Sequence, residues 1–217
     1  EHEADNGKTE MWYVIDAEEG ASLVYGFQHK VTPKLLKKAI ETGTLDKHLH
    51  KIKVRKGDVF YVPAGTVHGI GAGILIAEIQ ESSNVTYRVY DYNRVDKNGQ
   101  KRELHFDKAV RVMDMRIVAE NQQHHKIIKY YPGCSRELLC RCQYFEVERI
   151  QVNKAVSFSV RDQSFQVLMC LDGYGQIETM GTGLKPVRFM KGETIFIPAN
   201  MGRCVVVGNA ELIKIRC

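Results

Sequence analysis

The chain has 217 residues, of which 44% are hydrophobic, enough to bury one large core or two modest ones. Its 31 Lys and Arg are interleaved with 26 Asp and Glu, and the net charge of +5 includes no basic block of the kind that binds nucleic acid. No apolar run approaches the roughly 20 residues of a membrane span and no secretory segment is present, so we expect a cytoplasmic protein that binds neither nucleic acid nor membrane.

The first predicted strand, residues 10–15, carries one acid in an apolar and aromatic run. Because side chains alternate along a strand, Lys8, Glu10 and Trp12 lie on one face. Glu10 is therefore either an edge-strand carboxylate in water or a metal ligand inside the fold. A second strand is predicted over residues 21–27.

A helix follows this second strand. Thr32 can cap it, Pro33 suits its first position, and Gly43 suits its end. The apolar residues Leu35, Leu36, Ala39 and Ile40 form one face of it. We expect a small helical insertion near residues 32–50.

The next segment, residues 56–68, reads Lys-Gly-Asp-Val-Phe-Tyr-Val-Pro-Ala-Gly-Thr-Val-His. The apolar run suits a buried strand, Pro63 ends its hydrogen-bonded ladder, and Gly65 lets the backbone turn so that His68 points inward. The spacing Gly-x5-Pro-x-Gly-x2-His resembles a signature motif of the cupin barrels, in which the histidine is a metal ligand. The alternative is a hydrogen-bonded histidine in the core.

The segment is repeated later in the chain. Residues 191–200 match residues 56–65 at a constant offset of 135, which places Arg203 where the first copy has His68. We therefore expect an all-β protein of two cupin (jelly-roll) barrels. The first, residues 1–124, has the metal site and the helical insertion. The second, residues 125–217, is a degenerate copy without metal ligands.

Other elements fit an all-β fold. A strand is predicted over residues 74–80 and another over residues 82–90, which includes the single cation Arg88. A charged loop with Arg94 and a short helix over residues 107–113 follow. In the second half, short strands with regular turn signals favour a barrel over alternating strands and helices. They are predicted at 138–142, 145–151, 155–160, 165–171, 175–179, 194–197, 204–207 and 210–215, with a hairpin turn at 173–175.

Three motifs together resemble those of the type I mannose-6-phosphate isomerases. They are Gly-Lys-Thr-Glu-Met-Trp-Tyr (7–13), Pro-Ala-Gly-Thr-Val-His (63–68) and Glu-Ile-Gln-Glu-Ser-Ser-Asn-Val-Thr-Tyr-Arg (78–88). The sequences Thr-Tyr-Arg-Val-Tyr-Asp and Arg-Glu-Leu-His (102–105) are similar to those of the short bacterial enzymes. The resemblance implies a zinc ion held by Gln, His, Glu and His, with Glu10 as the third ligand and His68 as the fourth. The Gln-x-His pair would precede Glu10 by nearly twenty residues, so we expect an N-terminally truncated chain.

The resemblance also implies the reaction, the interconversion of mannose 6-phosphate and fructose 6-phosphate through a zinc-stabilised cis-enediol. Arg88 matches the active-site arginine of the family, and Arg94 matches a basic position associated with the phosphate. The alternatives are a salt bridge from Arg88 to Glu78 and a surface charge at Arg94. Lys8 or His105 could move protons, and the choice of general base stays open.

Two rival functions remain. One is a non-catalytic bicupin that binds a sugar or a small anion, and the other is a different cupin enzyme, such as a metal oxygenase. A single histidine in the motif strand argues against the oxygenase. Because two protein ligands leave a tetrahedral zinc half open to water, we expect this chain to bind zinc weakly and to be nearly inactive. The sequence leaves the native metal and the oligomeric state open.

Overall fold

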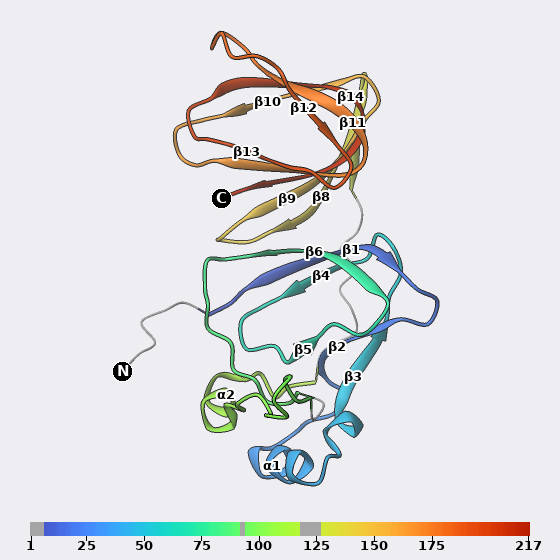
Figure 1. Ribbon diagram of the computed structural model, residues 1–217, viewed down its shortest axis with the longest axis vertical. Coiled ribbons are helices and arrows are strands. Elements are labelled where there is room, and N and C mark those ends of the chain that lie inside the picture. The colour runs from blue at the N-terminus through green and yellow to red at the C-terminus, as the bar shows by residue number, and fades with distance from the viewer. Residues whose placement is uncertain (1–6, 92–93, 118–126) are drawn as a thin grey trace. The chain divides into compact units, whose positions relative to one another are not determined.

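The computed structural model describes residues 7–91, 94–117 and 127–217. The chain divides into two compact units, unit 1 (residues 1–123) and unit 2 (residues 124–217). The domain boundary expected at residue 124 lies outside the described residues. Both units consist mainly of strands, as predicted (Figure 1). Among the described residues, no helix is long and apolar enough to cross a membrane.

Unit 1 contains two three-stranded antiparallel sheets. One has the order β4-β1-β6 and the other the order β3-β2-β5. The strands are β1 (Glu10–Ala17), β2 (Ser22–Phe27), β3 (Leu49–Lys53), β4 (Val59–Val62), β5 (His68–Gly69) and β6 (Ile74–Gln80). Buried side chains from both sheets, among them Trp12, Leu23 and Phe60, form one apolar cluster. The functional residues of β1 and β5 are thus attached to a packed core.

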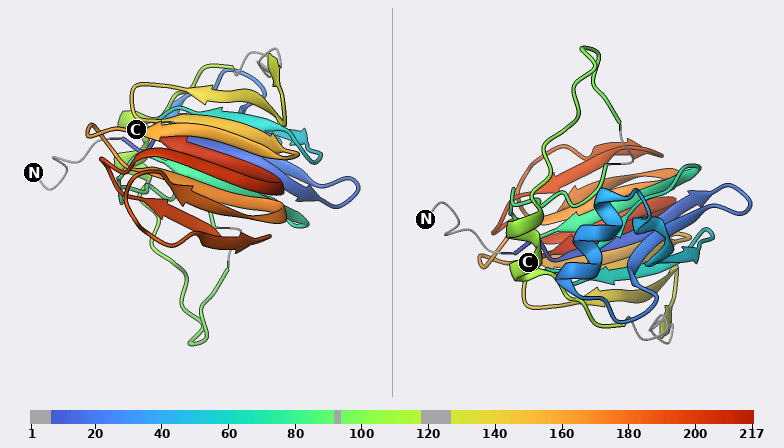
Figure 2. Two further views of the ribbon diagram at one scale, coloured as in Figure 1. Left: turned by 90° about the horizontal axis from the view of Figure 1, so that it is seen from above. Right: turned by 90° about the horizontal axis from the view of Figure 1, so that it is seen from below.

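The helices of unit 1 agree with the prediction. α1 (Pro33–Glu41) begins where Thr32 Oγ1 accepts a hydrogen bond from the backbone N–H of Leu35 at 3.3 Å. It is followed by the short 3-10 helix η1 (Leu45–Lys47), and both lie between β2 and β3. The short helix predicted at 107–113 is α2 (Phe106–Val112). The two helices lie side by side in front of the strands of unit 1 (Figure 2, right), and their apolar residues share one cluster.

Unit 2 is built on one large antiparallel sheet with the order β12-β11-β14-β9-β8-β7, with β10 paired to β14 and β13 to β11. The strands are β7 (Ile128–Tyr131), β8 (Cys134–Arg141), β9 (Glu146–Val152), β10 (Ala155–Val160), β11 (Gln166–Thr179), β12 (Val187–Met190), β13 (Thr194–Ile197) and β14 (Gly202–Arg216). Its core contains fully buried residues of most of these strands, including Ile150, Leu168 and Val206.

Three of the strand predictions are wrong. The hairpin turn expected at 173–175 does not form, because β11 runs through it as one strand with a bulge between Cys170 and Asp172. β14 likewise joins two strands that were predicted separately. Residues 82–90 form no strand and have no ladder partner among the described residues.

The two units share one pattern of strand pairing. β1 lies between β4 and β6 with a bulge between Val14 and Asp16, and the first half of β11 lies between β13 and β14 with its bulge at Cys170 and Asp172. The turns before β4 and β13 make equivalent hydrogen bonds to β1 and β11. Gly57 N–H donates to the carbonyl of Val14 at 2.8 Å, and Gly192 N–H donates to that of Cys170 at 2.9 Å. The internal repeat is therefore present in the backbone pairing as well as in the sequence.

The register corrects one equivalence. β2 pairs Tyr25 with His68, whereas the corresponding part of β11 pairs Thr179 with Cys204. The position of His68 is thus occupied in unit 2 by Cys204, and the assignment to Arg203 is wrong. One extra residue between β13 and β14 changes the offset from 135 to 136.

Candidate active site

Glu10 is the most deeply buried acid among the described residues of unit 1, with a side chain that is only 1% exposed. Trp12 Nε1 donates a hydrogen bond to Glu10 Oε2 at 2.8 Å, and Lys8 Nζ lies 2.9 Å from Oε1. Burial of a carboxylate is costly unless a cation or hydrogen bonds compensate it, and Trp12 and Lys8 compensate it here. The prediction that Lys8, Glu10 and Trp12 share a face is met.

His68 lies beside this carboxylate, on β5. Its Nδ1 is 2.8 Å from the backbone carbonyl of Thr66, and its ring packs edge-on against Trp12 with centroids 5.2 Å apart. A carbonyl only accepts, so Nδ1 carries the hydrogen and the lone pair of the neutral ring is on Nε2. Nε2 lies 3.9 Å from Glu10 Oε2, and the side chain is 33% exposed. A metal-binding histidine is commonly fixed through its other nitrogen in this way.

Glycines hold the strands of the site close together. Gly65 has a φ of +88°, and a Cβ at this position would lie 2.5 Å from the carbonyl oxygen of Val112 in α2. The backbone N–H of Asp114 donates to the Gly65 carbonyl at 2.9 Å. Gly7 packs equally closely on Ala64, where an added Cβ would lie 2.5 Å from the Ala64 Cβ. The Pro-Ala-Gly corner therefore has contacts on both sides that fix the position from which His68 projects.

The donor set of Glu10 and His68 fits zinc, which binds carboxylate oxygen and imidazole nitrogen at about 2.0–2.2 Å. The 3.9 Å between Glu10 Oε2 and His68 Nε2 is a separation that a single ion can bridge. Within residues 7–91, 94–117 and 127–217, no group of three or more His, Cys, Asp or Glu side chains could hold a metal. The described residues thus offer two ligands of a zinc shell.

Lys8 is held between two acids. Its Nζ lies 2.9 Å from Glu10 Oε1 and 3.4 Å from Glu78 Oε1. Burial lowers the pKa of Lys8, but the attraction of the two carboxylates outweighs it and raises the pKa above its ordinary value. Lys8 is therefore an ammonium cation at neutral pH. Glu78, which was considered as the partner of Arg88, contacts Lys8 instead.

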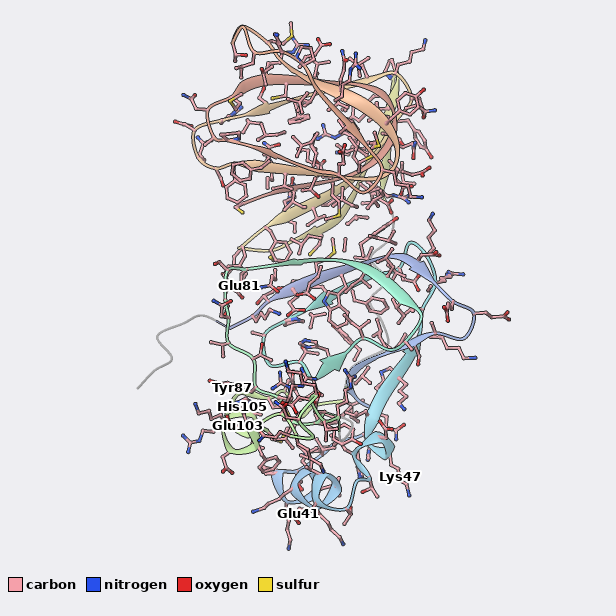
Figure 3. The ribbon with its side chains drawn as sticks, viewed as in Figure 1. Glu41, Lys47, Glu81, Tyr87, Glu103 and His105 are labelled. Atoms are coloured by element: carbon pink, nitrogen blue, oxygen red, sulfur yellow. The ribbon has the colours of Figure 1, made fainter. Side chains whose placement is uncertain are left out.

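Arg88 and His105 come together from different segments. The backbone N–H of Arg88 donates to His105 Nδ1 at 3.2 Å, and the N–H of His105 donates to the carbonyl of Arg88 at 2.7 Å. The proton of a neutral His105 ring is then on Nε2. The Arg88 guanidinium makes one long hydrogen bond, 3.4 Å to the carbonyl of Glu103, and no ion pair within 4 Å among the described residues. Figure 3 shows Tyr87, Glu103 and His105 grouped beside α2.

Arg102, which the sequence did not single out as a site residue, forms an ion pair in the same region. Its Nε donates to Asp91 Oδ2 at 2.7 Å and its Nη2 to Oδ1, a bidentate pair on a nearly buried carboxylate. The hydrogen bond from Arg102 lowers the pKa of Asp91 despite burial, and the charges of Arg94 and Arg88 lower it further. Arg94 itself begins a loop that extends away from the strands of unit 1 (Figure 2). Three arginines thus surround one carboxylate.

The two groups of residues meet at one apolar cluster. Val67, Val89 and Phe106 line the same small cavity. They are the chain neighbours of His68, Arg88 and His105, so three of the predicted site residues come from backbone segments that converge. The pairing of distant segments is what brings them together, and no local pattern in the sequence could have shown it.

Comparison with known proteins assigns the family. Residues 136–217 match the family model described as mannose-6-phosphate isomerase, cupin domain. The mannose-6-phosphate isomerase ManA of Bacillus subtilis is 37% identical over 95% of this chain and 64% of its own length. The enzyme of Streptococcus mutans is 36% identical over 98% of this chain and 65% of its own length. The chain therefore spans just under two thirds of these curated relatives.

Solved structures agree. The mannose 6-phosphate isomerase of Bacillus subtilis has a TM-score of 0.86 at 32% identity, over 99% of this chain and 66% of that one. A mannose 6-phosphate isomerase bound with zinc and yttrium has the same fold, with a TM-score of 0.69 at 12% identity over 97% of this chain and 66% of that one. Sequence and fold agree with the family indicated by the motifs between residues 7 and 105. The chain belongs to the mannose-6-phosphate isomerase family.

Proposed function

We propose that this chain provides the metal and substrate site of an isomerase that interconverts mannose 6-phosphate and fructose 6-phosphate through a cis-enediol. The observation that carries the proposal is the contact between Glu10 and His68, in a chain that resembles enzymes named for this reaction. The substrate is a small phosphosugar, in keeping with the three arginines whose charges lower the pKa of Asp91.

The architecture we propose is a pair of cupin barrels, residues 1–124 and 125–217. The shared strand pairing and the equivalent bulges support it. The helices α1 and η1 enlarge the first barrel between β2 and β3, where unit 2 has only the short connection between β11 and β12. The second barrel would bind no metal at the position of His68, because Cys204 there lies among buried apolar residues.

Zinc is the proposed cofactor, held by Glu10 and His68. The nitrogen and oxygen donors, the fixed Nδ1 of His68 and the 3.9 Å between His68 Nε2 and Glu10 Oε2 support it. When bound, zinc would supply a Lewis acid that polarises the sugar oxygens next to C1 and C2. Charge stabilisation, proton handling and phosphate binding would fall to the neighbouring side chains.

Lys8 and His105 are the proposed catalytic groups for charge and proton handling. Lys8 is a cation near Glu10, so it can stabilise negative charge that develops on the sugar oxygens. His105 has its Nδ1 occupied by the Arg88 N–H, so its Nε2–H is the group it can offer as a hydrogen-bond donor to a sugar oxygen. The proton that moves between C1 and C2 requires a base in addition to these two donors.

Arg88 and Arg94 are the proposed phosphate-binding residues. The Arg88 guanidinium pairs with no carboxylate among the described residues, and a planar fork suits a phosphate group. Arg102 holds Asp91, which in turn attracts Arg94 and Arg88. Asp91 is therefore a positioning residue for the arginines.

The test compares Glu10→Gln and His68→Ala with Glu41→Gln, a control that removes an exposed acid of α1. Zinc affinity is measured by equilibrium dialysis and isomerase activity by conversion of mannose 6-phosphate. We expect each site variant to lose at least tenfold in zinc affinity and most of any turnover, while the control matches the wild type. Equal zinc binding in all four proteins would refute the metal site.

A further inference from the structure

Unit 2 contains a cavity of about 780 Å³ that the proposed reaction does not use. Its volume is in the range of small-molecule sites, about 300–1,000 Å³. The walls come from β7, β8, β9, β10, β11 and β14 and from the segment between β10 and β11, all within unit 2. The cavity is therefore distinct from the Glu10 and His68 site of unit 1.

Positive side chains dominate the walls. Six cations, Lys129, Arg136, Arg141, Arg161, Lys214 and Arg216, face two carboxylates, Glu146 and Glu148. Each carboxylate is shared by two of these cations. Arg136 and Lys214 both lie 2.7 Å from Glu148 Oε2, and Arg141 and Arg216 both pair with Glu146. Lys129 and Arg161 have no ion pair among the described residues, so the side chains of the wall carry a surplus of positive charge.

Some buried polar atoms of the cavity wall also lack a hydrogen-bond partner among the described residues. Lys214 is 4% exposed, and its Nζ lies 5.5 Å above the centre of the Phe158 ring. Gln166 is 7% exposed, and its Nε2 donates to the carbonyl of Ser159 at 3.0 Å, while its Oε1 has no hydrogen-bond partner among the described residues. Arg136 Nε is a buried donor that likewise has no acceptor within the described part of the chain. Buried polar groups are normally paired, so the wall is built to receive polar atoms.

The internal repeat shows where this cavity lies in the fold. Glu10 pairs with Val62 and Gln80, and Gln166 pairs with Ile197 and Arg216 in the same register. Gln166 is thus the counterpart of Glu10, and Arg216 is the counterpart of Gln80. By the same register, Lys214 opposite Leu168 is the counterpart of Glu78 opposite Trp12.

The charges differ systematically between these equivalent positions. An acid in unit 1 is a neutral amide in unit 2, a second acid is a lysine, and a neutral amide is an arginine. Unit 1 therefore has acids that attract a cation, and unit 2 has bases at two of the three equivalent positions that attract an anion. The repeat therefore places a site of opposite charge preference at the equivalent position of the second unit.

We propose that the cavity of unit 2 binds a small anion through a carboxylate or phosphate group. Lys214 and the partly buried Arg136 share the single carboxylate of Glu148, and an oxyanion that contacts both would offset the cost of burying two cations against one negative charge. It would also supply an acceptor for Arg136 Nε. A hydroxyl on the same ligand would supply a donor for Gln166 Oε1.

Calorimetric titration at low salt with three probes tests the proposal. Glycerol 3-phosphate carries a phosphate, glycerate carries a carboxylate, and glycerol is the neutral control. The titrations are done in an Arg88→Ala background, so that the proposed phosphosugar site of unit 1 does not contribute. We expect at least one of the two anions to bind, and the stronger one identifies the preferred oxyanion.

Variants locate the binding. Arg161→Glu reverses an unpaired cation of the wall, and Gln166→Glu adds a negative charge with almost no change in shape. Arg188→Glu is the matched control, because Arg188 is exposed on β12 and lies outside the cavity. We expect both wall variants to weaken anion binding at least tenfold and the control to change it less than twofold. Binding of glycerol as tight as that of the anions, or equal losses in the wall variants and the control, would overturn the proposal.

Discussion

Arg88 is fixed through its backbone, while its guanidinium has only one weak internal contact. Replacing it with alanine should therefore cost little stability, less than about 1 kcal/mol, because a single exposed hydrogen bond is lost. Mannose 6-phosphate affinity should fall at least tenfold. Arg88→Lys should restore only part of it, since a point charge cannot reproduce the bidentate fork. Calorimetry and urea unfolding measure the two effects, and unchanged affinity would remove Arg88 from the site.

The cysteines differ in reactivity because they differ in burial. Burial, together with the neighbouring Cys142, raises the pKa of the Cys140 thiol to about 12, whereas Cys217 is exposed. Only the thiolate reacts quickly, so iodoacetamide at pH 8 should label Cys217 many times faster than Cys140 in the folded protein. Mass spectrometry of the digested protein reads out both sites, and Cys217→Ser is the control. Rapid labelling of Cys140 would contradict its burial.

Single residues could be predicted where a local rule applies. Alternation along β1 placed Lys8 and Glu10 together, and the Gly-x5-Pro-x-Gly-x2-His spacing indicated His68. The contact of His105 with Arg88 and the pairing of Arg102 with Asp91 could not be predicted, because residues 82–90 have no ladder that would define their neighbours. The sequence showed which residues of this region are charged, but not which residues they contact.

At the scale of the elements, Gly65 in the corner before β5 has both a left-handed backbone and a close contact with α2. Gly57, in the turn before β4, has the left-handed backbone alone, so comparing the two separates the two effects. Both Gly57 and Gly65 have a φ of +88°, but an added Cβ meets nothing within 4 Å at Gly57 and the Val112 carbonyl at 2.5 Å at Gly65. Gly57→Ala should cost about 1–2 kcal/mol for the left-handed backbone alone. Gly65→Ala should cost roughly 1–3 kcal/mol more for the clash. Urea unfolding measures both, and equal costs would mean that α2 yields without penalty.

Strand predictions failed where the chain continues through glycine. Gly173 was interpreted as part of a turn, and Gly208 falls between two strands that were predicted separately. The two glycines lie inside β11 and β14, where an added Cβ would collide with the backbone of the opposite strand. These glycines therefore permit close strand approach and do not end a strand. The position of α1 was predictable because the cap, the proline and the apolar face all agreed.

At the scale of the whole molecule, the repeat could be predicted from the sequence, while the difference between the copies required the register. A constant offset of 135 matched the motifs but missed the extra residue that puts Cys204 at the position of His68. Only pairing along β11 and β14 shows that Gln166 and Lys214 replace Glu10 and Glu78. At equivalent places the two copies thus differ in charge, with acidic or neutral side chains in unit 1 and neutral or basic ones in unit 2.

The response of the molecule to acid should reflect its buried ion pairs, because exposed pairs contribute little. Glu148 is the clearest case. Burial raises its pKa, but the hydrogen bonds and charges of Lys214 and Arg136 outweigh burial, so the pKa lies below its ordinary value of 4.5. A carboxylate with a lowered folded pKa stabilises the fold above the unfolded pKa, and this contribution is lost as the pH falls through the folded value.

Glu148→Gln should therefore be less stable than the wild type at pH 7, and the difference should shrink as the pH is lowered below 4.5 toward the folded pKa. There the wild-type side chain also becomes neutral. Glu193→Gln, at an exposed acid of the turn before β13, is the control and should show a smaller effect at pH 7. Urea unfolding of the three proteins between pH 3 and pH 7 gives the differences. A gap between Glu148→Gln and the wild type that stays constant across this range would show that the charge of Glu148 does not stabilise unit 2, and that the side chain acts only through its shape and packing.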